Sequence, residues 1–305
     1  MDSAMYASIG GIEFYLPEAV VQNEELAALS PGWTAEKIQS KTGISERHIA
    51  QPHECSSDLA CYAAEKLFAN GTCDRDDIDF LLFCTQSPDY LLPTTACLLQ
   101  DRLGLRTSIG ALDFNLGCSG YIYGLGLAQG LIETRQAANV LVLTADTYSK
   151  FLEPSDIGVR TLFGDAAAAT LVRGTDRATP AIGPYVYGTD GTGAENLIMK
   201  RHALRRPPEQ DDTSSRVESG TDEFLRMNGP EIFSFALNSV PKAVNQLLKR
   251  ANIELDEIDL FVFHQANEYM LERLRSKLKI PTEKFVIAMQ DCGNTVSSTI
   301  PVALH

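Results

Sequence analysis

Cys118 is the residue whose surroundings most clearly suggest chemistry. It lies in a turn of small residues, 115–120, between an apolar run that ends at residue 114 and a helix-like sequence. A thiol at the start of a helix faces the positive end of the helix dipole and unpaired backbone N–H groups. Such a place lowers the pKa of a thiol and offers donors to an oxyanion, so Cys118 is a candidate nucleophile. The alternative is an inert core residue, the commoner role of a cysteine in an apolar stretch.

Two polar side chains near the C-terminus are candidate partners for this nucleophile. Residues 258–263 are mostly bulky and apolar, which predicts a buried strand, and His264 ends it. A second apolar run, 285–289, predicts another strand, and Asn294 follows in a turn of small polar residues. Polar side chains at strand ends gather over the sheet edge in α/β folds, where an imidazole and an amide are uncharged donors. Each residue also has a simpler interpretation as the cap of the helix that follows it.

The chain repeats itself, which suggests how these groups meet. Residues 64–83 recur as residues 244–263, a separation of 180 residues, with a helix leading through a short loop into an acidic turn and an apolar strand. In each copy a helix, a second strand and a small-residue turn follow, and these turns carry Cys118 and Asn294. A duplicated βαβ unit would place both turns over one crevice.

The motifs are similar to those of the β-ketoacyl-[acyl-carrier-protein] synthase III family of thiolase-like condensing enzymes. The resemblance covers essentially the whole chain in family order, through residues 41–47, 115–120, 162–167, 264–267 and 293–301. It implies an α/β, thiolase-like fold with two duplicated βαβ-rich halves in a layered αβαβα arrangement. Residues 1–178 would form the half with the nucleophile, and residues 179–305 the half with the histidine and asparagine. Family members continue with closing strands beyond the helix near residue 301, so we expect such C-terminal strands to be missing from this chain.

The resemblance implies a decarboxylative Claisen condensation of an acyl-coenzyme A primer with a malonyl thioester, carried by acyl carrier protein. This acyltransferase chemistry serves fatty acid or related polyketide biosynthesis. Cys118 would take the acyl group, and His264 and Asn294 would donate to the enolate oxygen. Two alternatives stay open: an acyltransferase that passes the acyl group to an alcohol or amine, and an inactive or pairing subunit.

The resemblance also implies substrate-binding positions: Arg160, Asn267, Leu92, Lys41 and Thr42. In the family the arginine packs on the adenine of coenzyme A, a sound use of a cation over an aromatic face. The adenine-stacking tryptophan of the family has no match, because Lys37 occupies its place and Trp33 lies four residues earlier. Leu92 lies in a segment that resembles the family segment that closes the partner's acyl pocket across a homodimer interface. The resemblance implies that a leucine there leaves room for a longer or branched primer.

Composition fits a cytoplasmic enzyme without a metal site, and the resemblance implies that coenzyme A thioesters are substrates and that no cofactor is needed. The seven cysteines of the 305 residues are scattered without CxxC spacing, which argues against a disulfide framework and a zinc site. We interpret Cys292, close to Asn294, as a packing residue. No uncharged stretch reaches membrane-spanning length, and the formal charge of −14 argues against nucleic acid as a partner.

An acidic carrier protein requires a local basic patch on this acidic chain. The candidates are residues 200–206 and the basic face of residues 273–279, although a solvated helix face explains the second equally well. Residues 205–220 have no periodicity and predict a mobile surface loop, either a flap over the tunnel mouth or an insertion.

Overall fold

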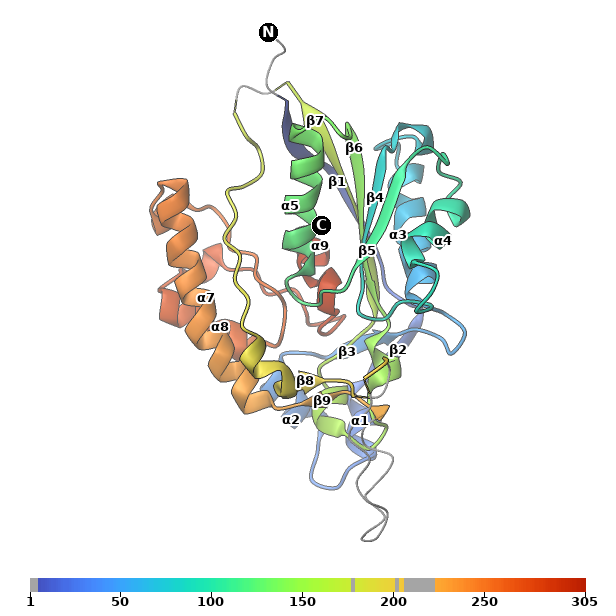
Figure 1. The fold of residues 1–305 in the computed structure, drawn as a ribbon. Coiled ribbons are helices and arrows are strands. Elements are labelled where there is room, and N and C mark those ends of the chain that lie inside the picture. Colours follow the sequence, from blue (N-terminus) through green and yellow to red (C-terminus); the bar gives the residue numbers. More distant parts are fainter. Residues whose placement is uncertain (1–4, 177–178, 201–202, 206–222) are drawn as a thin grey trace.

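A five-stranded mixed sheet forms the centre of the computed structural model, which describes residues 5–176, 179–200, 203–205 and 223–305 (Figure 1). Its order is β1-β7-β6-β4-β5, where the strands are β1 (Tyr6–Tyr15), β4 (Phe80–Cys84), β5 (Gly110–Phe114), β6 (Asn139–Asp146) and β7 (Ala166–Thr175). β4 runs parallel to β5 and β6, whereas β7 is antiparallel to β6 and β1. The carboxyl ends of β4, β5 and β6 therefore meet at one edge of the sheet.

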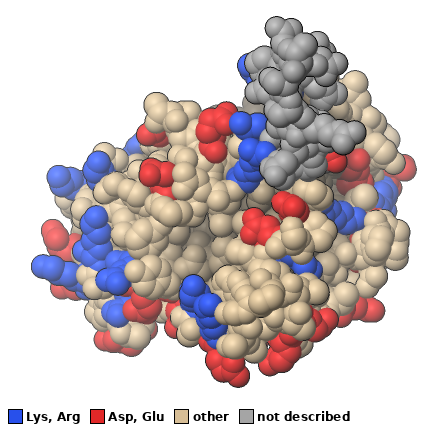
Figure 2. All heavy atoms as spheres, turned by 90° about the horizontal axis from the view of Figure 1, so that it is seen from below, with Lys and Arg blue, Asp and Glu red and all other residues tan. Residues whose placement is uncertain are grey.

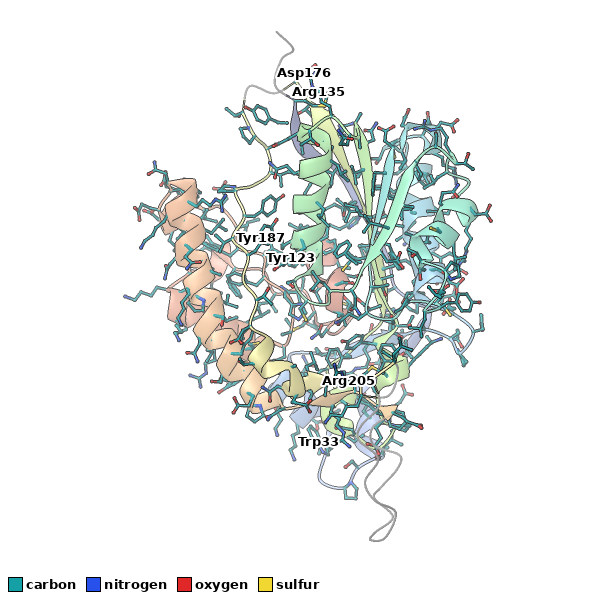
Figure 3. All side chains as sticks on the ribbon, viewed as in Figure 1. Trp33, Tyr123, Arg135, Asp176, Tyr187 and Arg205 are labelled. Atoms are coloured by element: carbon teal, nitrogen blue, oxygen red, sulfur yellow. The ribbon has the colours of Figure 1, made fainter. Side chains whose placement is uncertain are left out.

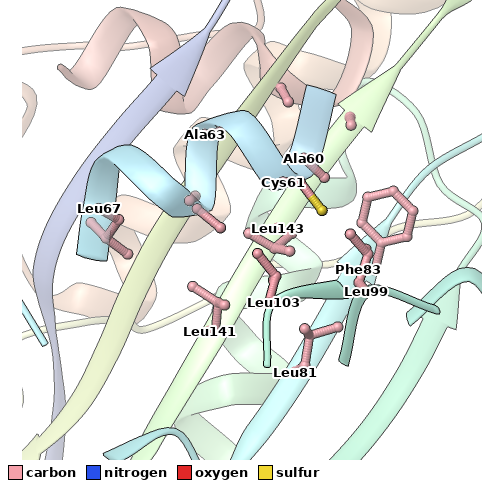
Figure 4. Close-up of a cluster of buried hydrophobic side chains, with 14 of the residues drawn as sticks. Ala60, Cys61, Ala63, Leu67, Leu81, Phe83, Leu99, Leu103, Leu141 and Leu143 are labelled. Carbon is pink, nitrogen blue, oxygen red and sulfur yellow. The ribbon is translucent and has the colours of Figure 1, made fainter. Parts of the chain in front are cut away.

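Helices cover both faces of this sheet (Figure 1). On one side lie α3 (Ser56–Ala69) and α4 (Thr95–Arg102), and on the other lie α5 (Gly120–Glu133) and α9 (Thr299–Leu304). The alternation of side chains along a strand accounts for this, because Leu81 and Phe83 of β4 pack toward α3, whereas Leu82 packs toward α5. The cluster beneath α3 consists of buried apolar side chains (Figure 4). It makes the sheet a rigid base for the turns at its edge.

Smaller elements lie at the carboxyl edge of the sheet. They are β2 (Ala19–Gln22), α1 (Asn23–Ala28), α2 (Ala35–Thr42), β3 (Glu46–Ile49), α6 (Ile157–Arg160), β8 (Leu197–Ile198) and β9 (Arg226–Met227). β2 pairs with β3 and β8 with β9, both antiparallel. α2 ends in a left-handed glycine, Gly43 at φ +74°, as helices commonly do.

The second half repeats the element order of the first. α3 leads through the 3₁₀ turn Arg75–Asp77 to β4, and α7 (Gly229–Ala251) leads through the 3₁₀ turn Leu255–Glu257 to residues 258–263. Both turns carry a capping box, formed by Asp74 with Asp77 and by Glu254 with Glu257. α8 (Glu268–Leu278) then takes the place of α4, and α9 that of α5. The order of helices and turns in the internal repeat predicted from the sequence is confirmed.

The prediction of regular strands at residues 258–263 and 285–289 is wrong. The two segments are extended and parallel, but they are joined by the single bridge Phe261↔Phe285. Phe261 N donates to Lys284 O at 2.7 Å, and Val286 N donates to Phe261 O at 3.0 Å. A strand needs a ladder of such bonds, and within the described residues neither segment has another strand partner. The second β-layer of the expected αβαβα arrangement is therefore represented by extended chain between α5 and the pair α7 and α8.

Among the described residues, no helix is both long and apolar enough to cross a membrane.

Candidate active site

Cys118 lies in the turn between β5 and α5, at the carboxyl edge of the sheet. The turn is packed too closely for larger residues on either side of the cysteine. A Cβ on Gly120 would collide with Sγ of Cys84, and one on Gly117 would lie 3.3 Å from Cγ1 of Val296. These glycines bring the half-buried Cys118 against the end of β4 and against the turn that follows Asn294.

Burial, together with the nearby Asp146 carboxylate, raises the pKa of the Cys118 thiol to about 12, against a backbone hydrogen bond that favours the thiolate. The expectation of a lowered pKa is therefore wrong for the free protein. Ser119 rather than Cys118 is the N-cap of α5, so the thiol lies outside the first turn, and desolvation outweighs the helix dipole. The resting site holds a neutral thiol.

Asn294 is buried and held by the other half of the molecule. Its backbone N donates to Leu162 O at 2.8 Å, and its backbone O accepts from Gly164 N at 3.1 Å. Its side-chain Oδ1 accepts from Val296 N at 3.0 Å. With its oxygen bound in this way, the amide keeps Nδ2 as its donor. The alternative interpretation as a cap of the following helix is not met, because Ser298 is the N-cap of α9.

Two glycines permit this close approach of the halves. Gly293 has φ +73°, and a Cβ there would lie 2.9 Å from Leu162 O. A Cβ on Gly164 would collide with the carbonyl oxygen of Cys292. Any larger residue at either position would push the Asn294 turn away from the first half.

His264 lies at the end of the extended segment 258–263. Its Nδ1 is 2.7 Å from Oγ1 of Thr299, the first residue of α9. Burial lowers the pKa of His264 to about 4, so the imidazole is neutral at physiological pH. The alternative interpretation of His264 as a helix cap is wrong, because the Asn267 side chain caps α8 by accepting from Met270 N at 2.8 Å.

Val296 joins the surroundings of the three candidate catalytic residues. Its backbone N donates to Asn294, its backbone O accepts from Thr299 Oγ1 at 3.2 Å, and its side chain faces Gly117. Val296 has φ +54°, which is rare for a β-branched residue and is characteristic of constrained functional turns. The structure thus brings the immediate neighbours of the predicted thiol, imidazole and amide into contact.

Sequence reasoning missed a buried carboxylate at this edge. Asp146 ends β6 and is fully buried; its Oδ1 accepts from Gln86 N at 2.8 Å, and its Oδ2 accepts from the backbone N of Ser297 at 3.2 Å and from the Ser297 hydroxyl. Burial raises the pKa of Asp146 to about 7. Gln86 in turn accepts from the hydroxyl of Tyr148 at 2.7 Å. An acidic residue that ends an apolar strand, 139–146, was the signal that could have found it.

Three of the five predicted substrate-binding residues, Lys41, Thr42 and Asn267, line one cavity of about 420 Å³. Its lining residues are Trp33, Ser40, Lys41, Thr42, Gly158, Thr161, Leu162, Asn267 and Tyr269. Trp33 lies beside α2 (Figure 3), and the amines of Lys37 and Lys41 are 5.1 and 5.2 Å from its ring centroid. The face that carries α2 is hollowed near its middle (Figure 2). Because Leu162 also holds Asn294, this cavity, which we call the α2 cavity, adjoins the candidate catalytic residues.

The other two predicted substrate-binding residues lie elsewhere. Arg160 lines a separate cavity that shares no residue with the α2 cavity, and its Nη1 donates to Pro154 O at 2.7 Å. Leu92 lies in the loop between β4 and α4, is 86% exposed and lines neither cavity.

The candidate basic patches are partly neutralised. Lys200 pairs with Glu195 at 2.7 Å, whereas Arg201, Arg206 and most of the predicted loop 205–220 lie outside the described residues. In α8, Arg275 pairs with Glu272 at 2.8 Å. The face shown in Figure 2 carries acidic groups among its basic ones.

All seven cysteines are free. Cys292 is buried, and burial raises the pKa of its thiol to about 12, in agreement with a packing role. Within the described part of the chain, no group of three or more histidine, cysteine, aspartate or glutamate side chains could hold a metal ion.

Comparison with known proteins places this geometry in a family. The family model described as 3-oxoacyl-[acyl-carrier-protein (ACP)] synthase III matches residues 112–191, and the model of its C-terminal part matches residues 248–305. A β-ketoacyl-[acyl-carrier-protein] synthase III from Caldanaerobacter subterraneus is 35% identical over 301 residues, which cover 98% of this chain and 88% of the relative. One from Clostridium perfringens is also 35% identical, over 98% of this chain and 89% of the relative.

Solved structures agree. A crystal structure of a 3-oxoacyl-(acyl-carrier-protein) synthase III is 55% identical with a TM-score of 0.93, over 98% of this chain and 90% of that chain. One from Burkholderia xenovorans is 36% identical with a TM-score of 0.88, over 98% and 84% of the two chains. This chain therefore belongs to the β-ketoacyl-[acyl-carrier-protein] synthase III family of thiolase-like condensing enzymes.

Proposed function

We propose that this protein condenses an acyl-coenzyme A primer with a malonyl thioester carried by acyl carrier protein, through an acyl group held on Cys118. The observation that carries the proposal is that Val296 contacts the turns of Cys118 and Asn294 and also contacts Thr299, whose hydroxyl meets the His264 imidazole. The reaction would start fatty acid or related polyketide chains.

The loading half-reaction uses Cys118. Its sulfur attacks the carbonyl carbon of the primer thioester, the carbon–sulfur bond to coenzyme A breaks, and the thiol proton leaves with the released coenzyme A. Backbone N–H groups at the start of α5 stabilise the oxyanion formed during attack. Because the resting thiol is protonated, proton removal is part of this step.

The decarboxylation half-reaction uses His264 and Asn294. Loss of carbon dioxide from the malonyl thioester leaves an enolate, whose oxygen carries the new negative charge. Two uncharged donors, Nε2–H of His264 and Nδ2–H of Asn294, stabilise this charge, and loss of one such donor typically costs about a hundredfold or more in rate. The enolate carbon then attacks the acyl thioester on Cys118, which leaves as the thiolate.

The α2 cavity would hold coenzyme A at the entrance. Trp33 and Tyr269 offer aromatic faces to a base, and Lys37 and Lys41 offer charge to phosphate groups. Trp33 would thus take the adenine from a position four residues before that of the family's tryptophan. In this proposal Arg160 is not the adenine partner, because it faces the other cavity.

A homodimer would cover the exposed loop at Leu92. Tyr90, Leu91 and Leu92 are consecutive apolar residues that are 61%, 70% and 86% exposed in the single chain. Such a patch is typical of a protein interface. We propose that it meets a second copy and that the protein acts in the cytoplasm, without metal or nucleic acid.

One experiment separates the proposed reaction from its alternatives. The protein is incubated with radiolabelled malonyl-acyl carrier protein and a panel of acyl-coenzyme A primers, and carbon dioxide and products are measured. Carbon dioxide with a product extended by two carbons supports condensation. Transfer to an alcohol or amine without carbon dioxide supports the second acyltransferase reaction, and absence of acylation on Cys118 supports an inactive or pairing subunit.

Two variants assign the roles within that assay. Cys118→Ala should abolish acyl loading, seen by mass spectrometry of the intact protein. Asn294→Ala should load normally and decarboxylate about a hundredfold more slowly. Condensation at the normal rate by Asn294→Ala would show that the amide has another role.

A further inference from the structure

A second cavity, which we call the Arg47 cavity, lies between β2, β3, α6 and the 3₁₀ turn Tyr148–Phe151. Its volume is about 330 Å³, and it shares no residue with the α2 cavity. Three cationic side chains line it: Arg47, Lys150 and Arg160. Most of the remaining wall is apolar and comes from Val21, Leu26, Ile49, Pro52, Leu152 and Phe163.

Arg47 is a buried cation that is bonded only to neutral acceptors. It is 1% exposed. Its Nη1 donates to Asn23 Oδ1 at 2.8 Å and Val21 O at 3.2 Å, and its Nη2 donates to Thr161 O at 2.9 Å. Its Nε is buried and has no hydrogen-bond partner among the described residues. A buried donor without a partner is costly, so an unfilled acceptor position belongs beside this guanidinium.

Among the described residues, the other two cations also bond to neutral acceptors. Lys150 donates to the backbone oxygens of Pro52 and Glu54, and Arg160 donates to Pro154 O. None of the three cations forms an ion pair with a carboxylate of the described residues. Three positive charges around one small cavity repel each other unless an anion joins them.

The acidic groups nearby do not supply that anion. The Asp165 carboxylate attracts Lys150, but its oxygens already accept from Ala50 N and from the N and Oγ of Ser149. Glu46 attracts Arg47, but its carboxylate accepts from the Gln22 side chain. Burial, together with repulsion from Arg160, lowers the pKa of Arg47 to about 10. The charge around the cavity therefore remains positive.

We propose that the Arg47 cavity binds a small organic anion, whose carboxylate or phosphate meets Arg47 and Arg160 and whose short apolar body packs on the apolar wall. The planar guanidinium groups suit both oxyanions. A volume of about 330 Å³ admits a chain of a few carbons and excludes a long lipid or a whole coenzyme A. The occupant would contact Phe163, whose neighbours Leu162 and Gly164 hold Asn294 in register.

Thermal unfolding of the full chain tests this site. The probes are hexyl phosphate, hexanoate and inorganic phosphate, with hexanol as the uncharged control. A ligand that binds only the folded state raises Tm in a saturable way. We expect a saturable rise with hexyl phosphate or hexanoate and none with hexanol, and the comparison with inorganic phosphate shows whether the apolar body contributes.

Variants locate the binding. Arg160→Gln should weaken the affinity measured by calorimetry about tenfold, because it removes a charged hydrogen-bond donor. Arg250→Gln is the matched control, since Arg250 also donates to a backbone oxygen, Tyr185 O, but lines neither cavity, and it should bind as the parent does. Lys41→Gln removes a charge from the α2 cavity, so a loss of affinity in this variant would show that the probe binds there.

The proposal is wrong if no anionic probe binds, or if Lys41→Gln weakens binding and Arg160→Gln does not. Hydrogen–deuterium exchange gives an independent measure. Protection by the bound probe should appear in β3 and residues 148–163, and protection confined to α2 and α8 would also overturn it.

Discussion

The imidazole of His264 and the hydroxyl of Thr299 are 2.7 Å apart, Nδ1 to Oγ1. Thr299 is the first residue of α9, the helix that follows Asn294. The helix next to one proposed donor, Asn294, therefore orients the other, His264. The Thr299 hydroxyl has two acceptors within reach of its one proton, Nδ1 of His264 at 2.7 Å and Val296 O at 3.2 Å. With the proton on the shorter contact, Nδ1 accepts and the ring proton lies on Nε2, the tautomer that an oxyanion donor requires.

Thr299→Val should impair decarboxylation and leave acyl loading intact. Valine has a similar shape but cannot donate to Nδ1, so it no longer fixes the tautomer or the ring orientation of His264. We expect the rate of carbon dioxide release to fall about tenfold, as is typical when an orienting partner of a functional histidine is lost. Thr299→Ser, which keeps the hydroxyl, should retain most activity. An equal loss in both variants would indicate a packing role for the threonine methyl group.

Asp146→Asn should lower the pKa of the Cys118 thiol. The Asp146 carboxylate disfavours a thiolate nearby, so removal of its charge favours ionisation. Alkylation of Cys118 by iodoacetamide, measured against pH, should be faster in the variant above pH 7. Below that pH the aspartate itself is protonated, because burial raises its pKa to about 7, and the two proteins should converge.

The pH dependence distinguishes this electrostatic effect from simple loosening of the site. A variant that only loosened the contact with Ser297 would alkylate faster at every pH. In the parent protein the rate should still be rising at pH 9, because burial raises the pKa of the thiol to about 12. A plateau near pH 7 would mean that the thiolate forms in the free enzyme.

Gly164→Ala should destabilise the protein and impair decarboxylation together. The added methyl group meets the carbonyl oxygen of Cys292, which is backbone and cannot move aside as a flexible side chain could. We expect a loss of about 1–3 kcal/mol in unfolding free energy, the usual range for overpacking. Gly130→Ala, within α5 and with nothing within 4 Å of the new Cβ, is the control. It should be neutral or slightly stabilising, by up to about 1 kcal/mol, in urea unfolding.

Trp33→Ala should raise KM for acyl-coenzyme A and leave KM for the same acyl group on a pantetheine fragment unchanged. The proposed stack on the adenine exists only with the whole coenzyme, and an aromatic stack on a base contributes about 1–3 kcal/mol, or roughly five- to 150-fold in affinity. Steady-state kinetics with both primers measures the difference. A parallel rise in both KM values would place Trp33 elsewhere in the substrate path.

The first half of the fold follows from local sequence. The apolar run that contains β4 is paired on both sides, and the turn before α5 falls where its small residues predicted it. Residues 258–263 are equally apolar, yet they form one bridge. The two segments differ in their pairing partners. A strand forms only where a distant segment hydrogen-bonds along its length, and the pattern of one apolar segment does not show whether such a partner exists.

The residues of the candidate site could be chosen from the sequence, but the electrostatics of the site could not. Cysteine, histidine and asparagine at three turns indicated a nucleophile and two donors. The thiol pKa depends on how deeply the turn is buried and on Asp146, a residue of another strand. Likewise, the place of Arg160 depends on the packing of α6 against Arg47, which no spacing in the sequence reveals.

The backbone bonds that join Asn294 to Leu162 and Gly164 have a consequence for any division of the chain. A polypeptide of residues 179–305 made alone would contain the Asn294 amide but not the backbone groups of Leu162 and Gly164 that position it. Residues 1–178 would contain those backbone groups without the amide. Mixing the two fragments should therefore restore carbon dioxide release only where they reassociate, so that the reaction itself reports fragment complementation.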